Sequence, residues 1–385
     1  MTTPEPLTRV WLGAYPADGA GGEPGTGEGI WRLDVDPLRG TVSGVLAMTS
    51  PAPSFLAASA DGRTLYAAGE TAPGTVSCFA VDPDGALSLR EQISSGGDHP
   101  CHLLVAPDGR TLYVSNYSSG TVGVLPLEAD GGFAEAVPAT ATPVQVLGHE
   151  GSGPVEDRQD GPHAHSAVLT PDAAHLLVAD LGTDEVRRYR RGADGSLTAD
   201  GVAVTLPPGT GPRHMVFSAD GRHLYLTGEL SASVLALAWD VEAAAGTVVQ
   251  ALPVQDEGRP NASGTAEPQP SAGRSPRDLP AHLALTGDRL LVSVREADVL
   301  VAFDLDDGLL RRAGEVTSGR WPRHFAVLGD GDLVLVAAER GHEVVSFGRP
   351  ARVGRHGLPP VEPLVRAAVW HVPSPACVLA SVPHV

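Results

Sequence analysis

Short runs of alternating hydrophobic and polar positions, separated by turns, occupy most of the chain. A representative stretch, "GPRHMVFSADGRHLYLTGEL", covers residues 211–230. Met215 and Phe217 lie two positions apart before its turn, and Leu224 and Leu226 lie two positions apart after it. A period of two places side chains on one face of a strand, and the intervening "DGR" favours a tight turn. The stretch therefore predicts a β-hairpin.

The hairpin pattern recurs along the chain, which indicates a repeat architecture. Each copy is followed by a third alternating run such as "GTVSCFAVD" or "ADVLVAFDL", and three of these runs meet a further turn, "DPDG", "EADGG" or "GADG", that predicts a fourth strand. The other copies cover residues 53–70, 100–117, 164–181, 280–295 and 322–339.

A seventh unit is present only as two halves at opposite ends of the chain. The N-terminal "RVWLGAY" and "GIWRLDVD" match later strands of the repeat, and "PSPACVLASV" at residues 373–382 matches a first strand. Joining both termini in one blade closes a ring and removes exposed sheet edges. We therefore expect an all-β protein, a seven-bladed β-propeller of four-stranded blades forming a single domain over residues 1–385. Residues 140–161 and 255–279 lack a hydrophobic period and are expected to be loop insertions.

The composition of the chain argues against some classes of binding partner. The 385 residues carry a formal net charge of −19, with a pI near 5.0, which argues against nucleic acid and against an anionic membrane surface. The three cysteines form no CxxC, so neither a disulfide framework nor a structural zinc site is indicated. Without a signal-peptide pattern or a long apolar run, the chain is expected to be cytoplasmic, as a monomer or weak homo-oligomer.

Charged residues occupy the repeat positions that should face one mouth of the central channel. His165, Arg213 and Arg323 precede first strands, and Glu229 and Arg295 follow second strands. The insertions should rise over the same mouth, since they lead into first strands. A single Arg213–Glu229 pair would be explained as an ion pair in the channel, but the convergence of polar groups from several blades favours a binding site.

The "GPHAHS" motif admits two interpretations. His163 and His165 would point to one face of a strand and can hold a metal, but the repeat places no further ligands beside them. We favour His165 as an acid–base group with a pKa near neutrality, and His163 as a supporting, substrate-side hydrogen-bond partner. The remaining histidines that share one repeat position are expected to be structural: His102, His214, His282 and His324.

Three motifs, "GPHAHS", "GTGPRHMVF" with "GEL", and "WPRHFAV", resemble the seven-bladed lactonase family across nearly the whole chain. That family includes cofactor-free bacterial 6-phosphogluconolactonases and fungal carboxy-cis,cis-muconate cyclases. The resemblance implies a site of one histidine, two arginines and a glutamate, matching His165, Arg213, Glu229 and Arg295. The chain departs from the family at "READVLV", where Glu296 follows Arg295, and in the length of the proline-rich insertion before that blade.

The resemblance favours hydrolysis of a sugar lactone, 6-phospho-D-glucono-1,5-lactone foremost, without cofactor or metal. Arg213 and Arg295 would bind the anionic group or the developing oxyanion, Glu229 and His165 would share the base and acid roles, and Arg323 would hold the phosphate. A muconate-type lactonising or lactone-opening enzyme and a non-catalytic ligand-binding propeller are the alternatives. A calcium-dependent lactonase using Asp180 and Asn116 fits less well, because the mouth carries arginines rather than clustered carboxylates.

Overall fold

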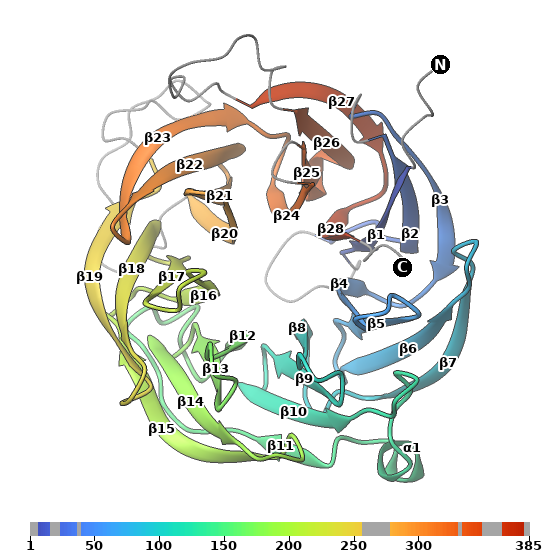
Figure 1. Cartoon of the computed structure of the whole chain (residues 1–385), viewed down its shortest axis with the longest axis horizontal. Helices are drawn as coiled ribbons and strands as arrows, with labels where there is room; N and C mark the ends of the chain where they lie inside the picture. Colours follow the sequence, from blue (N-terminus) through green and yellow to red (C-terminus); the bar gives the residue numbers. More distant parts are fainter. Residues whose placement is uncertain are drawn as a thin grey trace.

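The strands form a closed ring of antiparallel sheets around a central channel (Figure 1). The computed structural model describes residues 7–15, 24–36, 40–255, 278–329, 333–348 and 364–380. Within these ranges there are seven sheets of four strands each, with the first strand of each repeat innermost. The seven-bladed β-propeller predicted from the repeat is thereby confirmed.

Both chain ends contribute to the first blade, as predicted. Its innermost strand is C-terminal, and its three outer strands are N-terminal: β28 (Pro375–Ala380), β1 (Thr8–Ala14), β2 (Gly29–Val35) and β3 (Val42–Thr49). Strands β28 and β1 pair antiparallel, with Val10 opposite Ala380. This pairing closes the ring without leaving a free strand edge at the channel.

The second, third and fourth blades follow in chain order. Blade 2 holds β4 (Pro53–Ala58), β5 (Thr64–Gly69), β6 (Thr75–Val81) and β7 (Leu87–Ser94). Blade 3 holds β8 (Pro100–Val105), β9 (Thr111–Asn116), β10 (Thr121–Pro126) and β11 (Gln145–Leu147), with the short helix α1 (Ala136–Thr140) before β11. Blade 4 holds β12 (Ala164–Leu169), β13 (His175–Asp180), β14 (Glu185–Arg191) and β15 (Leu197–Thr205).

The last three blades complete the ring. Blade 5 holds β16 (Pro212–Phe217), β17 (His223–Gly228), β18 (Ser233–Asp240) and β19 (Ala245–Pro253). Blade 6 holds β20 (Leu279–Thr286), β21 (Arg289–Arg295), β22 (Val299–Asp306) and β23 (Leu309–Thr317). Blade 7 holds β24 (Pro322–Leu328), β25 (Leu333–Ala338), β26 (Glu343–Gly348) and β27 (Val365–His371), with the 3-10 turn η1 (Glu339–Gly341) after β25.

The expectation that residues 140–161 form only a loop was wrong for part of the segment. Residues Gln145–Leu147 form β11, the outer strand of blade 3, which pairs with β10. The Gln145 side chain donates to the Leu197 carbonyl at 3.2 Å and accepts from its N–H at 2.8 Å, which ties β11 to the next blade. The otherwise unpaired edge of β10 explains why so short a run adopts strand structure. Most of the 255–279 insertion lies outside the described residues.

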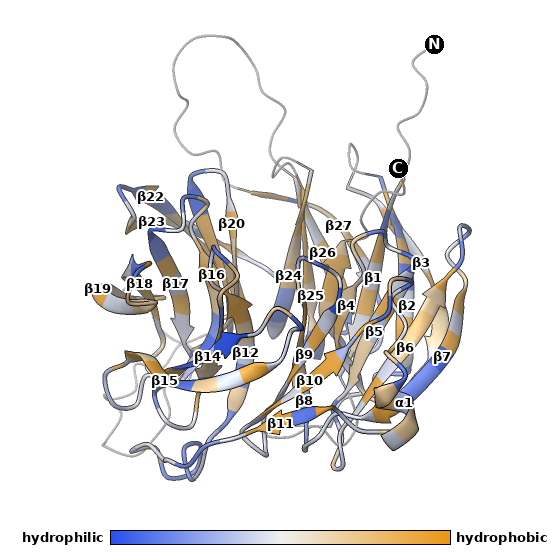
Figure 2. Cartoon of the chain, turned by 60° about the horizontal axis from the view of Figure 1, so that its bottom comes forward, coloured by the Kyte–Doolittle hydropathy of each residue, from blue (hydrophilic) through white to orange (hydrophobic). Residues whose placement is uncertain are grey.

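Apolar packing between neighbouring blades forms the core. Figure 2 shows hydrophobic residues along middle strands such as β6 and hydrophilic residues along outer strands such as β7. Tyrosines at one repeat position add polar links, because each hydroxyl donates to the carbonyl of a turn glycine in the following blade. These links run from Tyr66 to Gly131 (2.5 Å), Tyr113 to Gly195 (2.9 Å) and Tyr225 to Gly308 (3.1 Å).

Candidate active site at the channel mouth

A β-bulge at the start of every innermost strand aims the candidate residues at the mouth. In β16, pairing with β17 is regular at Pro212 and resumes at Met215, so Arg213 and His214 fall within the irregularity. A bulge places an extra residue in one strand and redirects its side chains, and bulges recur beside active sites. Equivalent shifts occur in the other six blades. The repeated bulge therefore explains how one residue per blade reaches the mouth while its neighbour faces the channel.

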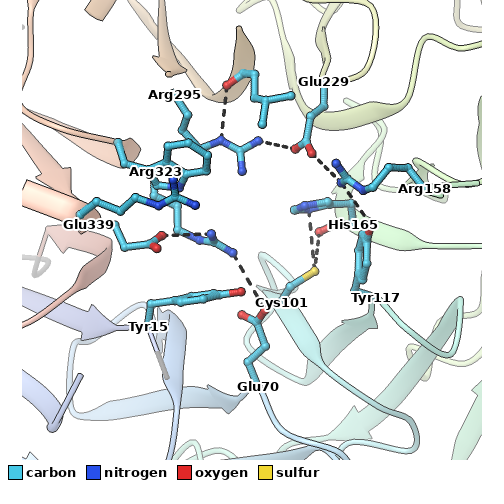
Figure 3. A pocket seen from close by; sticks show the side chains of 13 residues that line it. Tyr15, Glu70, Cys101, Tyr117, Arg158, His165, Glu229, Arg295, Arg323 and Glu339 are labelled. Carbon is cyan, nitrogen blue, oxygen red and sulfur yellow. Dashed lines mark hydrogen bonds and ion pairs between the residues drawn. The ribbon is translucent and has the colours of Figure 1, made fainter. Parts of the chain in front are cut away.

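Side chains from several blades line one polar pocket at this mouth (Figure 3). Counting the part open to solvent, the pocket holds about 670 Å³ of space not filled by protein atoms. The lining holds four arginines and three glutamates, so it is locally cationic in a chain of net charge −19. The lining residues are Tyr15, Glu70, Cys101, Tyr117, Arg158, His165, Glu229, Leu279, Arg295, Trp321, Arg323, Glu339 and Arg340.

Glu229 is held by three guanidinium groups. Its Oε1 atom lies 2.7 Å from Nη2 of Arg158, and its Oε2 atom lies 3.0 Å from Nε of Arg213 and 2.5 Å from Nη2 of Arg295. Burial by itself would raise the pKa of Glu229, but Arg295, Arg158 and Arg213 together hold that pKa well below its usual value. Glu229 is therefore an anchored carboxylate that binds protons weakly.

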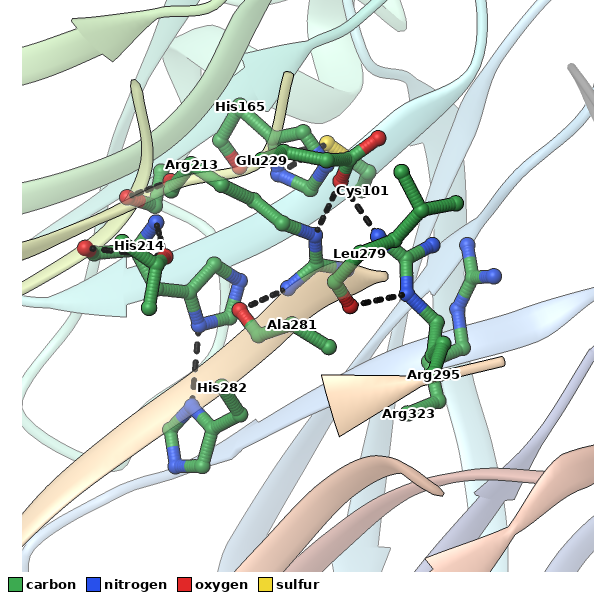
Figure 4. A network of polar contacts seen from close by, with 12 residues as sticks. Cys101, His165, Arg213, His214, Glu229, Leu279, Ala281, His282, Arg295 and Arg323 are labelled. Atoms are coloured by element: carbon green, nitrogen blue, oxygen red, sulfur yellow. Dashed lines mark hydrogen bonds and ion pairs between the residues drawn. The ribbon is translucent and has the colours of Figure 1, made fainter. Parts of the chain in front are cut away.

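Arg213 lies beneath the pocket rather than in its wall (Figure 4). Its side chain is 4% exposed, and Nη1 donates to the Ala281 carbonyl at 2.5 Å. Burial and the nearby Arg295 lower the pKa of Arg213 to about 9, so the group remains protonated at neutral pH. The sequence left two explanations of the Arg213–Glu229 pair, an ion pair in the channel and part of a binding site. The structure contains the ion pair, and the Glu229 carboxylate also lines the pocket.

His165 lines the pocket as a neutral imidazole. Its Nδ1 atom lies 3.8 Å from Sγ of Cys101, whose thiol also lies 3.3 Å from the His165 carbonyl oxygen. Burial and the Arg213 charge lower the pKa of His165 well below 6.5. The expectation of a pKa near neutrality was wrong, because the repeat pattern does not reveal how fully the ring is buried or that Arg213 lies beneath it.

Arg323 belongs to a second polar group on another wall of the pocket. Its Nη1 atom lies 3.0 Å from Oε2 of Glu339, and its guanidinium carbon lies 4.0 Å above the Tyr15 ring centre. Glu70 is further away, with 4.0 Å between its Oε1 atom and Nη2 of Arg323. Much of the charge on Arg323 is therefore already balanced by Glu339.

His163 does not line the pocket. Its ring stacks on Tyr117, with centroids 4.5 Å apart and planes 11° apart, and Nδ1 lies 3.0 Å from the Tyr117 carbonyl oxygen. The Tyr117 hydroxyl in turn accepts from Nη2 of Arg158 at 3.3 Å. His163 therefore supports a pocket residue from behind, which corrects its predicted position on the substrate side.

Sequence reasoning missed Arg158, which the 140–161 insertion brings into the pocket. The buried Gln159 anchors this segment, because its Nε2 donates to the Leu181 carbonyl at 2.9 Å and its Oε1 accepts from the Val155 N–H at 3.1 Å. Arg158 and Gln159 lie in a polar insertion without a hydrophobic period, so no repeat position in the sequence marks either residue. The only sequence cue to Arg158 was the expectation that this insertion rises over the mouth.

The described residues give no support to a calcium site. Asp180 Oδ1 accepts from the N–H groups of His163, Gly182 and Thr183, and its Oδ2 lies 3.2 Å from Nε2 of His149. Asn116 donates to Ser95 and Thr121. Neither residue lines the pocket, and no group of three or more metal-ligating side chains occurs within the described ranges.

Below the pocket, the channel holds a layer of histidines, of which His214 and His324 are buried and His102 and His282 are partly buried. The His214 and His282 Nδ1 atoms are 2.9 Å apart, and the His282 and His324 rings stack with centroids 3.8 Å apart. His102 packs edge-on against His214. Burial lowers the pKa of each ring, to about 3 for His102 and His324, so the layer is neutral.

The fold and the site together define the class of protein: a seven-bladed propeller with a cationic small-molecule pocket at one mouth of its channel. The family model described as "Lactonase, 7-bladed beta-propeller" matches residues 9–379. The chain therefore belongs to the seven-bladed β-propeller lactonase family. Among the described residues, no helix has the length and apolar character needed to span a membrane.

Named relatives agree with this family. A 6-phosphogluconolactonase of Bacillus subtilis is 29% identical over 361 residues, covering 92% of this chain and 95% of the relative. One of Formosa agariphila is 28% identical over 327 residues, covering 82% and 86%. The solved structure of a periplasmic gluconolactonase of Pseudomonas aeruginosa is 30% identical, with a TM-score of 0.80 and coverage of 98% and 100%.

Proposed function

We propose that the protein hydrolyses a sugar lactone at the channel mouth, with 6-phospho-D-glucono-1,5-lactone as the preferred substrate. The observation that carries the proposal is the carboxylate of Glu229, shared by three guanidinium groups beside the neutral imidazole of His165. This cluster offers a base and fixed cationic donors, which are the two things a reactive ester carbonyl requires. The relatives named as lactonases support the same chemistry.

In this mechanism His165 accepts a proton from the attacking water. It is unprotonated at neutral pH, whereas Glu229 is already occupied by its arginines. Arg295 stabilises the oxyanion that develops on the lactone carbonyl, because its Nη1 atom makes no hydrogen bond to the residues the structure describes. Glu229 and the Leu279 carbonyl hold that guanidinium in position. Fixed donors in a site that excludes water stabilise such charge most strongly.

Arg158 is the residue proposed to hold the phosphate, in place of Arg323. Three guanidinium groups share the single charge of Glu229, so that side of the pocket keeps a positive surplus. Arg323 instead faces both Glu339 and Glu70. Arg158 is also the more exposed of the two, with 29% of its side chain accessible against 16%. A guanidinium at the rim suits a doubly charged phosphate.

The test is lactone hydrolysis by purified, EDTA-treated protein. Freshly generated 6-phosphogluconolactone and unphosphorylated gluconolactone are compared after correction for spontaneous opening, with Glu229→Gln as the site variant and the exposed Glu128→Gln as its control. We expect metal-free turnover that favours the phosphorylated lactone and is lost only in the site variant. No rate above background on either lactone would overturn the proposal and leave the muconate-type and pure binding hypotheses to be tested.

A further inference from the structure

Three glutamates of the pocket occupy one repeat position but have different surroundings. Each follows the second strand of its blade, and the residue before it pairs with the proline that begins the first strand. The three pairs are Pro53 with Gly69, Pro212 with Gly228 and Pro322 with Ala338. The glutamates that follow are Glu70, Glu229 and Glu339.

In two of these blades the residue after the proline is an arginine that pairs with the blade's own glutamate. Arg213 lies 3.0 Å from Glu229, and Arg323 lies 3.0 Å from Glu339. Blade 2 has Ser54 at the same position. Glu70 therefore lacks the intra-blade arginine that the other two glutamates have.

Glu70 is nevertheless a buried part of the pocket wall. It is 4% exposed and lies across the pocket from Glu229 (Figure 3). Among the described residues, the one guanidinium within 4.0 Å of its carboxyl belongs to Arg323, at 4.0 Å, which is too long for a hydrogen bond. The charged or titratable groups whose electrostatic fields reach it are Tyr15, Cys101, Arg213, Arg323 and Glu339.

We propose that Glu70 is the proton donor of the site, giving its proton to the ring oxygen that leaves when the lactone opens. This inference rests on the proposed lactonase function. His165 takes a proton from water as the water oxygen bonds to the carbonyl carbon. The carbon–oxygen bond of the ring then breaks, and the Glu70 proton completes the new hydroxyl group. Protonated His165 and ionised Glu70 exchange a proton through solvent, so the net reaction is lactone plus water to hydroxy acid.

Of the pocket glutamates, Glu70 has a raised pKa and Glu229 a lowered one, as expected if Glu70 is the proton donor. Burial raises the pKa of Glu70, and the charge of Arg323 together with the hydroxyl of Ser54 only partly offsets the effect. Glu229 has its pKa held well below the usual value by its arginines, so it carries no proton to donate. Pairs of titratable groups whose environments separate their pKa values mark acid and base assignments. The difference has two sources: Arg295, Arg158 and Arg213 surround Glu229, whereas the repeat position of Arg213 holds Ser54 in the blade of Glu70.

The experiment compares wild type with Glu70→Gln and with Glu339→Gln, the equivalent position in a blade that has its own arginine. We expect Glu70→Gln to lower kcat on gluconolactone by about 100-fold, within the range for loss of a general acid. The wild-type rate should fall as pH rises through the pKa of Glu70, and this alkaline decline should be absent in Glu70→Gln but retained in Glu339→Gln. Thermal melting confirms that each variant is folded.

An infrared difference spectrum between wild type and Glu70→Gln, recorded at a pH below the alkaline decline in rate, gives a second readout. It should contain the C=O band of a protonated carboxyl group, which a purely structural carboxylate would not give. An active wild type with unchanged rate and pH profile in Glu70→Gln, or a spectrum without this band, overturns the role of Glu70 alone. A wild type that opens no lactone overturns the proposed function as well.

Discussion

The Nη2 atom of Arg158 lies 2.7 Å from Oε1 of Glu229, although the two residues are 71 positions apart and belong to different parts of the ring. The contact joins an insertion in front of blade 4 to the exit of a strand in blade 5. Because Arg213 and Arg295 occupy the other oxygen, the insertion completes the set of charges around Glu229. The insertion is therefore part of the pocket and not merely a connection between blades.

Arg158→Gln should weaken binding of the phosphorylated lactone selectively. We expect KM for 6-phosphogluconolactone to rise about 10- to 100-fold, equivalent to about 1.4–2.8 kcal/mol, since hydrogen bonds to charged groups are worth about 1.5–3 kcal/mol. KM for gluconolactone should change much less, because that substrate has no phosphate. Steady-state kinetics on both lactones measure the difference. The exposed Arg63→Gln is the matched control, and an equal loss on both substrates would contradict a phosphate contact.

Glu229→Gln should destabilise the fold as well as the activity. The substitution leaves Arg213 and Arg295 buried beside each other without their shared counter-charge. Breaking a buried pair by removing one partner costs about 3–5 kcal/mol. Urea unfolding should therefore show a lower free energy of unfolding.

The double variant Arg213→Met/Glu229→Gln tests the cause of that loss. It should recover part of the stability, because one of the uncompensated charges is then gone. A double variant less stable than wild type by the sum of the losses in Arg213→Met and Glu229→Gln would indicate that charge balance is not responsible. Circular dichroism before denaturation checks that each protein starts folded.

Stability should fall as the pH drops below about 6.5. Burial depresses the pKa values of His102, His165, His214, His282 and His324 in the folded state. The unfolded chain, with values near 6.5, then binds more protons below that pH, and each extra proton contributes a slope of about 1.4 kcal/mol per pH unit. This stabilisation is fully present above pH 6.5 and is lost progressively towards the folded-state values.

Urea unfolding between pH 7.5 and pH 4.5, a range of about three units that includes the ordinary histidine pKa, measures this slope. His282→Gln should reduce it, because the buried layer then has one ring fewer to protonate. His371→Gln, at an exposed position, should leave it unchanged. Equal slopes in wild type and His282→Gln would show that the layer does not control acid stability.

Cys101→Ala should retain most of the lactonase activity, although the thiol lies beside His165 in the pocket. Burial raises the pKa of Cys101, so the group is a neutral thiol and a poor nucleophile. We expect kcat within a few-fold of wild type, consistent with loss of packing only, and slow reaction with iodoacetamide at neutral pH. Loss of activity to background in Cys101→Ala, with melting unchanged, would instead indicate covalent catalysis.

The residue pattern predicted much of the pocket because a propeller repeats one local geometry. Turn residues and period-two runs mark each hairpin, and the repeat then aligns equivalent positions such as Arg213 and Arg323 without any knowledge of the fold in space. The structure places His165, Glu229, Arg295 and Arg323, four residues of that alignment, in the lining of one pocket. Glu70 and Glu339 occupy the same repeat position as Glu229, but position alone does not distinguish the three glutamates.

The sequence by itself determined the blades, the closure of the ring by both termini and the mouth at which polar residues gather, since these follow from local periodicity and turn chemistry. Tertiary structure alone decided the protonation states of the pocket residues and the charges that surround them. Burial of His165, the approach of Arg158 from an insertion and the 4.0 Å separation of Glu70 from Arg323 depend on distances between blades. Proton affinity is set by desolvation and by neighbouring charges in space, and neither quantity is local in the chain.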